Sequence, residues 1–348
     1  MRSAAPLKNA AQDSRRMVAC VPGARCAGEG DVTGKLSGGT FAPAVTLTSM
    51  KRRTFLQLAP ALACPGVFAQ QPAQPKVHMR RIPSSGEEIP AVGLGTWITF
   101  NVGDDAQART TSAEVMRQFF AAGGRLIDSS PMYGSSQGVI GEGLHRLGMP
   151  RQAFAADKVW TSGNGPTQIE ASRQLWRVPR FDLLQVHNLL AWERQLPLLQ
   201  AMKAAGQLRY VGISTSEGRR HAELEQIMRT HRIDFVQLTY NPLDRDVEQR
   251  LLPLAQERGI AVLANRPFRE GALTRQLQRH PLPAWAKEID CTTWAQVVLK
   301  YIVTHPAITC AIPATSQPTH VRENMAAATG RMLDEAQRQR IAQHIARL

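Results

Sequence analysis

Short hydrophobic runs alternate with amphipathic segments along the chain after Lys76. The short runs fit buried strands, and the segments between them repeat their hydrophobic positions with the period of a helix. The expected strands are 91–96, 126–128, 153–158, 181–187, 210–214, 235–240, 260–264 and 308–312. The expected helices are 112–122, 139–147, 167–176, 192–205, 222–230, 247–258, 293–304, 319–328 and 334–346. Eight β–α units over about 270 residues predict one (β/α)8 TIM barrel of the α/β class across residues 76–348.

Two segments depart from this alternation. Residues 77–89 hold Ser84-Ser85-Gly86 between two extended runs, which predicts an N-terminal β-hairpin. The segment that follows 260–264 contains two prolines and is expected to be an irregular insertion. A doubly wound dinucleotide-binding sheet is excluded, because neither GLG at 93–95 nor GEG at 141–143 completes the GxGxxG turn of that fold.

The first 75 residues have a different character. Residues 1–49 are rich in Ala, Gly and Arg without a sustained period, so they are expected to be disordered or to reflect an upstream start site. Residues 50–69 carry paired arginines (52–53) before TFL and end in small residues. This order is typical of a signal for the twin-arginine export machinery, cleaved near Ala69, and predicts a periplasmic or otherwise exported protein. An amphipathic helix with a basic start fits less well, because prolines interrupt the segment.

The formal net charge of +14 raises the hypothesis of a nucleic-acid partner. However, residues 1–75 carry nine Lys and Arg against three Asp and Glu, so +6 of this charge lies outside the predicted barrel. No basic-aromatic interleaving or zinc-finger spacing supports nucleic-acid binding, and the remaining charge could equally attract an anionic cofactor. Only Cys291 and Cys310 fall in the predicted mature chain, so no disulfide framework is expected.

Chemically active side chains stand at the ends of successive predicted strands. Asp128 ends one strand and Tyr133 follows it, Lys158 ends the next strand, and His187 ends the third. In a parallel barrel the loops at these strand ends build the active site. Taken alone, each residue has an ordinary structural explanation, such as a strand-end histidine or an ion pair at the rim. Their occurrence together favours function.

Seven segments extend this pattern through the chain in a fixed order. They are VGLGTW (92–97), LIDSSPMYG (126–134), DKVW (157–160), DLLQVHN (182–188), VGIST (211–215), VQLTYNP (236–242) and IPATSQPTHVREN (312–324). Together they resemble the aldo-keto reductase family. The resemblance implies NAD(P)H-dependent reduction of an aldehyde or ketone, with NADP as cofactor and NAD as the alternative. It also places Asp128, Tyr133, Lys158 and His187 on the family's catalytic tetrad.

The chemistry of carbonyl reduction requires these residue types. The reaction takes a hydride from nicotinamide and a proton from an acid near the forming alkoxide. Tyr133 is assigned as this general acid, and Lys158 is expected to lower its pKa from about 10. Asp128 is expected to hold the ammonium of Lys158, and His187 to orient the carbonyl oxygen.

The resemblance also implies a set of cofactor contacts. They are Thr96, Trp97, Ser214, Thr215, Gln237, Arg266, Thr315, His320, Glu323 and Asn324. Ala314 and His320 replace the family's usual basic clamp for a 2'-phosphate, which leaves the choice between NADP and NAD open. Asn265 and Arg266 stand where a stacking tyrosine is usual. Arg266 is expected to stack on the ring, to hold the pyrophosphate, or to be a solvated loop arginine.

Two further function classes are kept as alternatives. The departures at Asn265 and Arg266 motivate an exported nicotinamide-binding barrel with little turnover that acts as a sensor or partner module. A metal-dependent barrel hydrolase is weakly supported, because no pair of His or Cys has the spacing of metal ligands. A monomer without a stable membrane anchor is expected by default, since no run has the length of a transmembrane helix.

Overall fold

Eight parallel strands form the centre of the protein in a computed structural model that describes residues 76–149 and 151–348. They are β3 (Leu94–Gly95), β4 (Leu126–Asp128), β5 (Phe154–Val159), β6 (Leu183–Val186), β7 (Tyr210–Ser214), β8 (Phe235–Thr239), β9 (Ala261–Asn265) and β10 (Cys310–Ala311). Each strand pairs with its neighbours in chain order. The prediction of a twin-arginine signal at residues 50–69 lies outside the described residues.

Backbone hydrogen bonds between the first and last strands close the ring. The N–H of Gly93 donates to the carbonyl of Ala311 at 2.8 Å, and the N–H of Gly95 donates to Pro313 at 3.0 Å. A side chain at Gly95 is incompatible with this closure, since its Cβ would lie 2.6 Å from the carbonyl oxygen of Ile312. The glycine therefore allows the two edges to meet.

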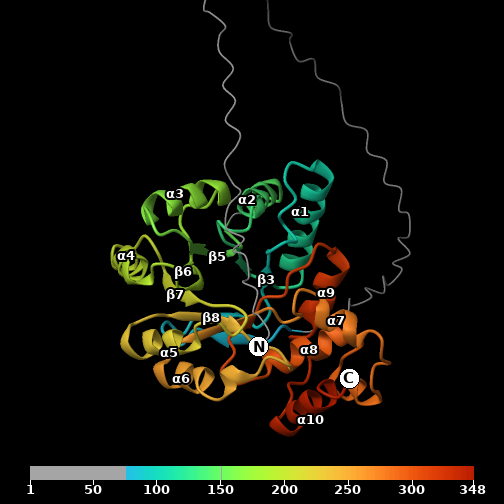
Figure 1. The fold of residues 1–348 in the computed structure, drawn as a ribbon. Coiled ribbons are helices and arrows are strands. Elements are labelled where there is room, and N and C mark those ends of the chain that lie inside the picture. The colour runs from blue at the N-terminus through green and yellow to red at the C-terminus, as the bar shows by residue number, and fades with distance from the viewer. Residues whose placement is uncertain (1–75, 150) are drawn as a thin grey trace, which may run out of the picture. The chain divides into compact units, whose positions relative to one another are not determined.

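Helices surround the ring of strands, as Figure 1 shows. They are α1 (Ala106–Ala121), α2 (Ser136–Arg146), α3 (Gly165–Trp176), α4 (Trp192–Ala204), α5 (His221–Thr230), α6 (Leu251–Arg258), α7 (Ala272–Leu277), α8 (Trp294–Val303), α9 (Pro318–Ala326) and α10 (Glu335–Ile345), with short 3-10 turns η1 (His187–Leu189), η2 (Asp246–Glu248) and η3 (Ala284–Ile289). The predicted (β/α)8 barrel with a C-terminal helix is confirmed. Among the described helices, none is long and apolar enough to cross a membrane.

Three predicted elements differ most from the observed ones. Helix α1 begins at Ala106 rather than at residue 112, because Asp105 caps it by accepting from two backbone N–H groups. Its first turn, AQAR, has no large hydrophobic side chain from which a helical period could be recognised. The insertion expected to be irregular contains α7 and η3. The single helix expected at 247–258 is divided into η2 and α6.

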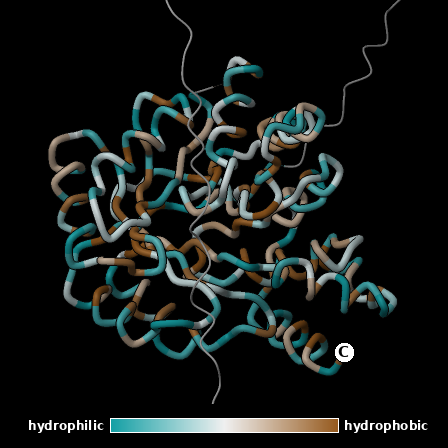
Figure 2. Tube along the Cα trace, turned by 45° about the horizontal axis from the view of Figure 1, so that its top comes forward, coloured by the Kyte–Doolittle hydropathy of each residue, from teal (hydrophilic) through white to brown (hydrophobic). Residues whose placement is uncertain are grey.

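The hydrophobic core has two layers separated by the strands. Side chains that point into the ring include an aromatic group of Phe154, Tyr210 and Phe235, with ring centres 5.5–6.2 Å apart. The larger layer lies between the strands and the helices. Hydrophobic stretches gather toward the interior in Figure 2, and hydrophilic ones dominate the outer parts of the helices.

The predicted hairpin closes one end of the barrel. Strands β1 (Met79–Arg81) and β2 (Glu88–Pro90) pair antiparallel, and the fully buried Ile82 and Ile89 join the inner layer of the core. The hydroxyl of Tyr210 donates to Ser85 at 2.7 Å. The hairpin therefore plugs the amino-terminal ends of the strands, and any open site must lie at their carboxyl-terminal ends.

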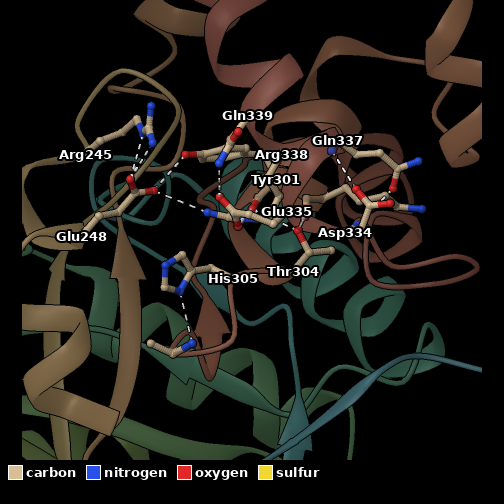
Figure 3. Close-up of polar contacts among 12 residues, drawn as sticks. Arg245, Glu248, Tyr301, Thr304, His305, Asp334, Glu335, Gln337, Arg338 and Gln339 are labelled. Atoms are coloured by element: carbon tan, nitrogen blue, oxygen red, sulfur yellow. Dashed lines mark hydrogen bonds and ion pairs between the residues drawn. The ribbon is translucent and has the colours of Figure 1, made fainter. Parts of the chain in front are cut away.

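Helix α10 is attached to the barrel through Arg338, which is 3% exposed. Its guanidinium lies 4.5 Å from the centre of the Tyr301 ring and donates to the hydroxyl of Tyr240 at 2.7 Å. Figure 3 shows Glu248 between Arg338 and Arg245. Its Oε1 lies 3.4 Å from Arg338 Nη2, and its Oε2 lies 2.7 Å from Arg245 Nη2. These contacts join α10 to α8 and to the segment after β8.

Candidate active site

A cavity of about 800 Å³ opens at the carboxyl-terminal ends of the strands. Its wall consists of the segments that follow β3, β4, β6, β7, β9 and β10, together with the first turns of α9. This is the end of a (β/α)8 barrel at which loops assemble active sites.

Lys158 and Asp128 form a buried ion pair beside this cavity. The Nζ of Lys158 lies 2.5 Å from Asp128 Oδ2 and donates to the carbonyl of Ser129 at 2.8 Å. The other oxygen of Asp128 accepts from Gln237 at 2.8 Å and from Gln185 at 3.1 Å. Burial alone would lower the pKa of Lys158, but the Asp128 carboxylate and neighbouring groups more than offset this, so the pKa is raised. The ammonium therefore stays charged.

Tyr133 follows β4 and lines the cavity, with its ring centre 5.1 Å from the Nζ of Lys158. Burial raises the pKa of Tyr133 and outweighs the lowering by Lys158, so the pKa lies above its ordinary value of 10.0. The expected lowering by Lys158 is present, but the pKa of Tyr133 is raised overall, because desolvation disfavours tyrosinate more than the ammonium favours it. The phenol is protonated at neutral pH, which is the state that a proton donor needs.

His187 follows β6 and presents a neutral imidazole to the cavity. Burial, and then the charge of Lys158, lower the pKa of His187 to about 2. Its Nδ1 lies 2.8 Å from Ser130 Oγ, which also accepts the N–H of Met132 at 3.2 Å. When the hydroxyl of Ser130 donates to Nδ1, the ring proton is on Nε2 and can be donated to a ligand oxygen.

The structure brings the predicted site residues together. Asp128, Tyr133 and His187 line the cavity, and Lys158 lies behind them. The residues predicted to contact the cofactor all line the same cavity: Thr96, Trp97, Ser214, Thr215, Gln237, Arg266, Thr315, His320, Glu323 and Asn324.

The wall formed by β7, β8 and β9 holds an unpaired hydroxyl. The Oγ1 of Thr215 is buried and has no hydrogen-bond partner among residues 76–149 and 151–348. Asn265 is held by donation to the Thr215 carbonyl at 2.9 Å and by acceptance from Thr239 at 2.7 Å. Buried polar atoms are normally hydrogen-bonded, so the unpaired hydroxyl of Thr215 is an exception in this wall of the cavity.

Arg266 is ion-paired rather than solvated. Its Nη1 lies 2.9 Å from Glu217 Oε1 and also contacts Glu270, and its side chain is 20% exposed. All three residues line the cavity. The interpretation of Arg266 as a solvated loop arginine is therefore wrong, because two carboxylates hold its guanidinium at the cavity.

Sequence reasoning missed several residues that shape the site. Ser130 lies within the LIDSSPMYG motif, but nothing local shows that it contacts His187. Gln185 carried a signal, since it is a polar residue two positions before His187 within the hydrophobic strand β6. Glu217 and Glu270 sit in loops with no distinctive pattern, and only the fold brings them to Arg266.

Within the part of the chain that the structure describes, no three His, Cys, Asp or Glu residues are grouped to hold a metal ion. Cys291 and Cys310 are both buried and free there.

The chain belongs to the aldo/keto reductase family, whose sequence profile matches residues 91–346. A methylglyoxal reductase of Escherichia coli, YeaE, is 29% identical over 260 residues, which cover 72% of this chain and 89% of the relative. An NADH-specific methylglyoxal reductase of the same organism is 24% identical over 316 residues, which cover 72% of this chain and 93% of the relative. The chain is thus an oxidoreductase of this family.

Solved structures share the fold. An aldo/keto reductase from Klebsiella pneumoniae, in complex with NADP and acetate, superposes with a TM-score of 0.66 at 23% identity, over 76% of this chain and 95% of that one. The holo form of an aldo-keto reductase from Bacillus halodurans superposes with a TM-score of 0.63 at 20% identity. The match covers 78% of this chain and 96% of that one.

Proposed function

We propose that this protein reduces an aldehyde or ketone to an alcohol with NADPH, with NADH as the alternative coenzyme. The observation that carries the proposal is the grouping of a protonated tyrosine, a buried Lys–Asp pair and a neutral histidine at one cavity. Tyr133, Lys158, Asp128 and His187 are its catalytic residues.

The side chains have distinct roles in this proposal. A bound reduced nicotinamide supplies the hydride. His187 donates from Nε2 to the carbonyl oxygen and orients it. Tyr133 gives its proton to the same oxygen as the alcohol forms. Lys158, held by Asp128, then stabilises the tyrosinate that remains.

The cavity fits a nicotinamide coenzyme at several points. The unpaired hydroxyl of Thr215 offers a hydrogen bond to a polar group of the coenzyme. Helix α9 begins at Pro318, and Gln317 and His320 of its first turn line the cavity, so its backbone N–H groups can meet a phosphate. Arg266 also lines the cavity, where its guanidinium is paired with Glu217 and Glu270.

The named relatives suggest the first substrate to test. Two Escherichia coli relatives are named for methylglyoxal reduction, which makes small oxo-aldehydes the first candidates. A larger aromatic aldehyde should be tested beside them, because Ile98 and Met132 at the cavity are exposed hydrophobic side chains.

The test is a fluorescence titration of the purified full-length chain with NADPH and with NADH, followed by addition of methylglyoxal or an aromatic aldehyde. Binding followed by oxidation of the coenzyme supports the reductase and identifies its preferred coenzyme. Binding without oxidation favours the sensor module, and no binding of either coenzyme contradicts both functions.

Tyr133→Phe separates proton donation from coenzyme binding. The variant should lose turnover by about 10²–10⁴-fold, because the donated proton is gone, while the Kd for coenzyme stays within about twofold. Tyr210→Phe is the matched control, since this tyrosine contacts the hairpin at the closed end of the barrel. Loss of coenzyme binding in Tyr133→Phe would show that the residue has a different role.

We also propose that the protein is exported as a folded monomer through the twin-arginine route. The paired arginines 52–53, the following TFL and the small residues near Ala69 support this. Replacement of both arginines by lysine should retain the protein in the cytoplasm of a bacterial host that has this route. Equal amounts of both forms in the periplasm would contradict the proposal, and gel filtration tests the monomer.

A further inference from the structure

An alternating chain of charges runs along one wall of the cavity. The guanidinium of Arg219 lies 2.9 Å from Glu217 Oε2, and Glu217 Oε1 lies 2.9 Å from Arg266. Arg266 also contacts Glu270 through the same nitrogen. The four residues come from the loops that follow β7 and β9, and all of them line the cavity.

The backbone holds the central ion pair, Glu217 and Arg266, in place. Glu217 and Arg266 have φ values of 60° and 51°, which residues other than glycine seldom adopt. The N–H of Glu217 donates to Thr239 at 2.9 Å, and the carbonyl of Arg266 accepts from Asn241 at 3.2 Å. Strained backbone of this kind persists where the surrounding structure enforces it, and it is common at ligand sites.

A guanidinium binds carboxylate and phosphate oxygens with the same geometry. Two carboxylates on Arg266 therefore occupy the positions that phosphate oxygens of a ligand would take. They also add negative charge to a cavity that is proposed to receive an anionic coenzyme.

We propose that Glu217 and Glu270 are internal competitors for Arg266. The diphosphate of the coenzyme displaces these carboxylates from the guanidinium, and the two glutamates lower coenzyme affinity and hasten its release. This inference rests on the proposed function, since it requires the coenzyme to occupy this cavity.

The exchange leaves no charge buried without a partner. Glu217 keeps Arg219 through its second oxygen when Arg266 turns to a phosphate. The side chain of Glu270 is 39% exposed, so its carboxylate returns to water. Because each carboxylate has this second environment, the displacement avoids the large penalty of stranding a desolvated ion.

The first test measures the Kd for NADPH in Glu217→Gln, Glu270→Gln and the double variant. Each single change should tighten binding about twofold to fivefold, the range of a partly exposed ion pair, and the double change should tighten it further. The gain should appear mainly as slower coenzyme release in stopped-flow displacement.

The second test introduces Arg266→Gln into the wild type and into the Glu217→Gln/Glu270→Gln double variant. Removal of the guanidinium should weaken NADPH binding more in the Glu217→Gln/Glu270→Gln background than in the wild type, because the competing carboxylates are absent there. Equal effects in both backgrounds would overturn the inference. Glu170→Gln is the matched control, since Glu170 also binds an arginine at 2.6 Å but does not line the cavity.

The outcomes separate this inference from the function on which it rests. If the wild type binds coenzyme and reduces aldehyde while both single glutamine variants bind equally or more weakly, the inference is wrong and the reductase stands. If the wild type binds neither NADPH nor NADH, both are wrong. Glu270→Gln alone suffices should the double variant fold poorly, because this side chain is partly exposed.

Discussion

Ser130 contacts the ring of His187 and fixes its Nε2–H tautomer when the serine hydroxyl donates to Nδ1. Its hydroxyl lies 2.8 Å from Nδ1, while burial keeps the imidazole neutral. Only the Nε2–H tautomer can donate to a carbonyl oxygen from the ring nitrogen that Ser130 leaves free. A hydroxyl outside the predicted tetrad therefore contacts and orients the ring of one tetrad member.

Ser130→Ala should reduce kcat by about tenfold to a hundredfold, because the ring loses the partner that orients it. The Kd for coenzyme should change little. Ser129→Ala is the control, since the side chain of Ser129 bonds to Ser136 at 3.0 Å and only its carbonyl contacts Lys158. Equal losses of kcat in the two variants would argue against a role of Ser130 in the tautomer.

At the scale of elements, Asp157 joins β5 to the helix layer. It lies next to Lys158 but on the opposite face of the strand, where it accepts from Gln137 of α2 at 2.6 Å. Gln137 in turn donates to Ser172 of α3 at 2.9 Å. Burial raises the pKa of Asp157 from 3.8 to about 7, although Lys158 and these hydrogen bonds oppose the shift.

This raised pKa predicts a pH-dependent stability. Between about pH 4 and pH 7 the folded state holds a proton that the unfolded chain has lost, so the contribution of Asp157 to the free energy of unfolding falls as the pH rises and is constant above pH 7. Relative to Asp157→Asn, the wild type should lose up to about 4 kcal/mol across this window. Urea unfolding of both proteins from pH 4 to pH 8 measures the difference, and parallel curves would contradict it.

Helix α10 depends on Arg338 for its attachment. Arg338→Met keeps the aliphatic stem but removes donors to Tyr240 and Glu248, so it should lower the free energy of unfolding by about 2–4 kcal/mol. Amide exchange should speed up first in residues 335–345. Arg340→Met on the same helix is the control, since its pair with Glu288 at 3.3 Å is exposed, and a similar loss there would contradict the prediction.

At the scale of the whole molecule, the proposed coenzyme site joins both ends of the barrel sequence. Its wall runs from Thr96, after β3, to Asn324 of α9. A ligand that contacts both Thr96 and Asn324 should stabilise the barrel where its first and last strands meet. Binding to the folded state alone raises the free energy of unfolding.

NADPH at about 100 times its Kd should add about 2.7 kcal/mol to stability and raise Tm by roughly 4–5 °C for a chain of this length. Differential scanning fluorimetry with and without NADPH measures this shift, with sodium phosphate at equal ionic strength as the control. An equal shift with phosphate would mean that no specific coenzyme contact contributes.

The hydrophobic pattern was sufficient to predict the order of strands and helices along the chain. Predicted and observed bounds agree at β4 and β7, where short runs of buried residues have clear polar limits. Helix α7 was missed because the prolines that follow it, at 281 and 283, dominated the local signal. The start of α1 was missed because its capping residue precedes a turn without large hydrophobic side chains.

The sequence by itself determined the barrel, the family and the four strand-end residues, because these depend on local periodicity and on motifs that are contiguous in the chain. Only the tertiary structure decided the net pKa shift of Tyr133, the contact of Ser130 with His187 and the two carboxylates on Arg266. The physical reason is that desolvation and ion pairing depend on distances between loops that are remote in sequence. Those distances exist only once the ring of strands has closed.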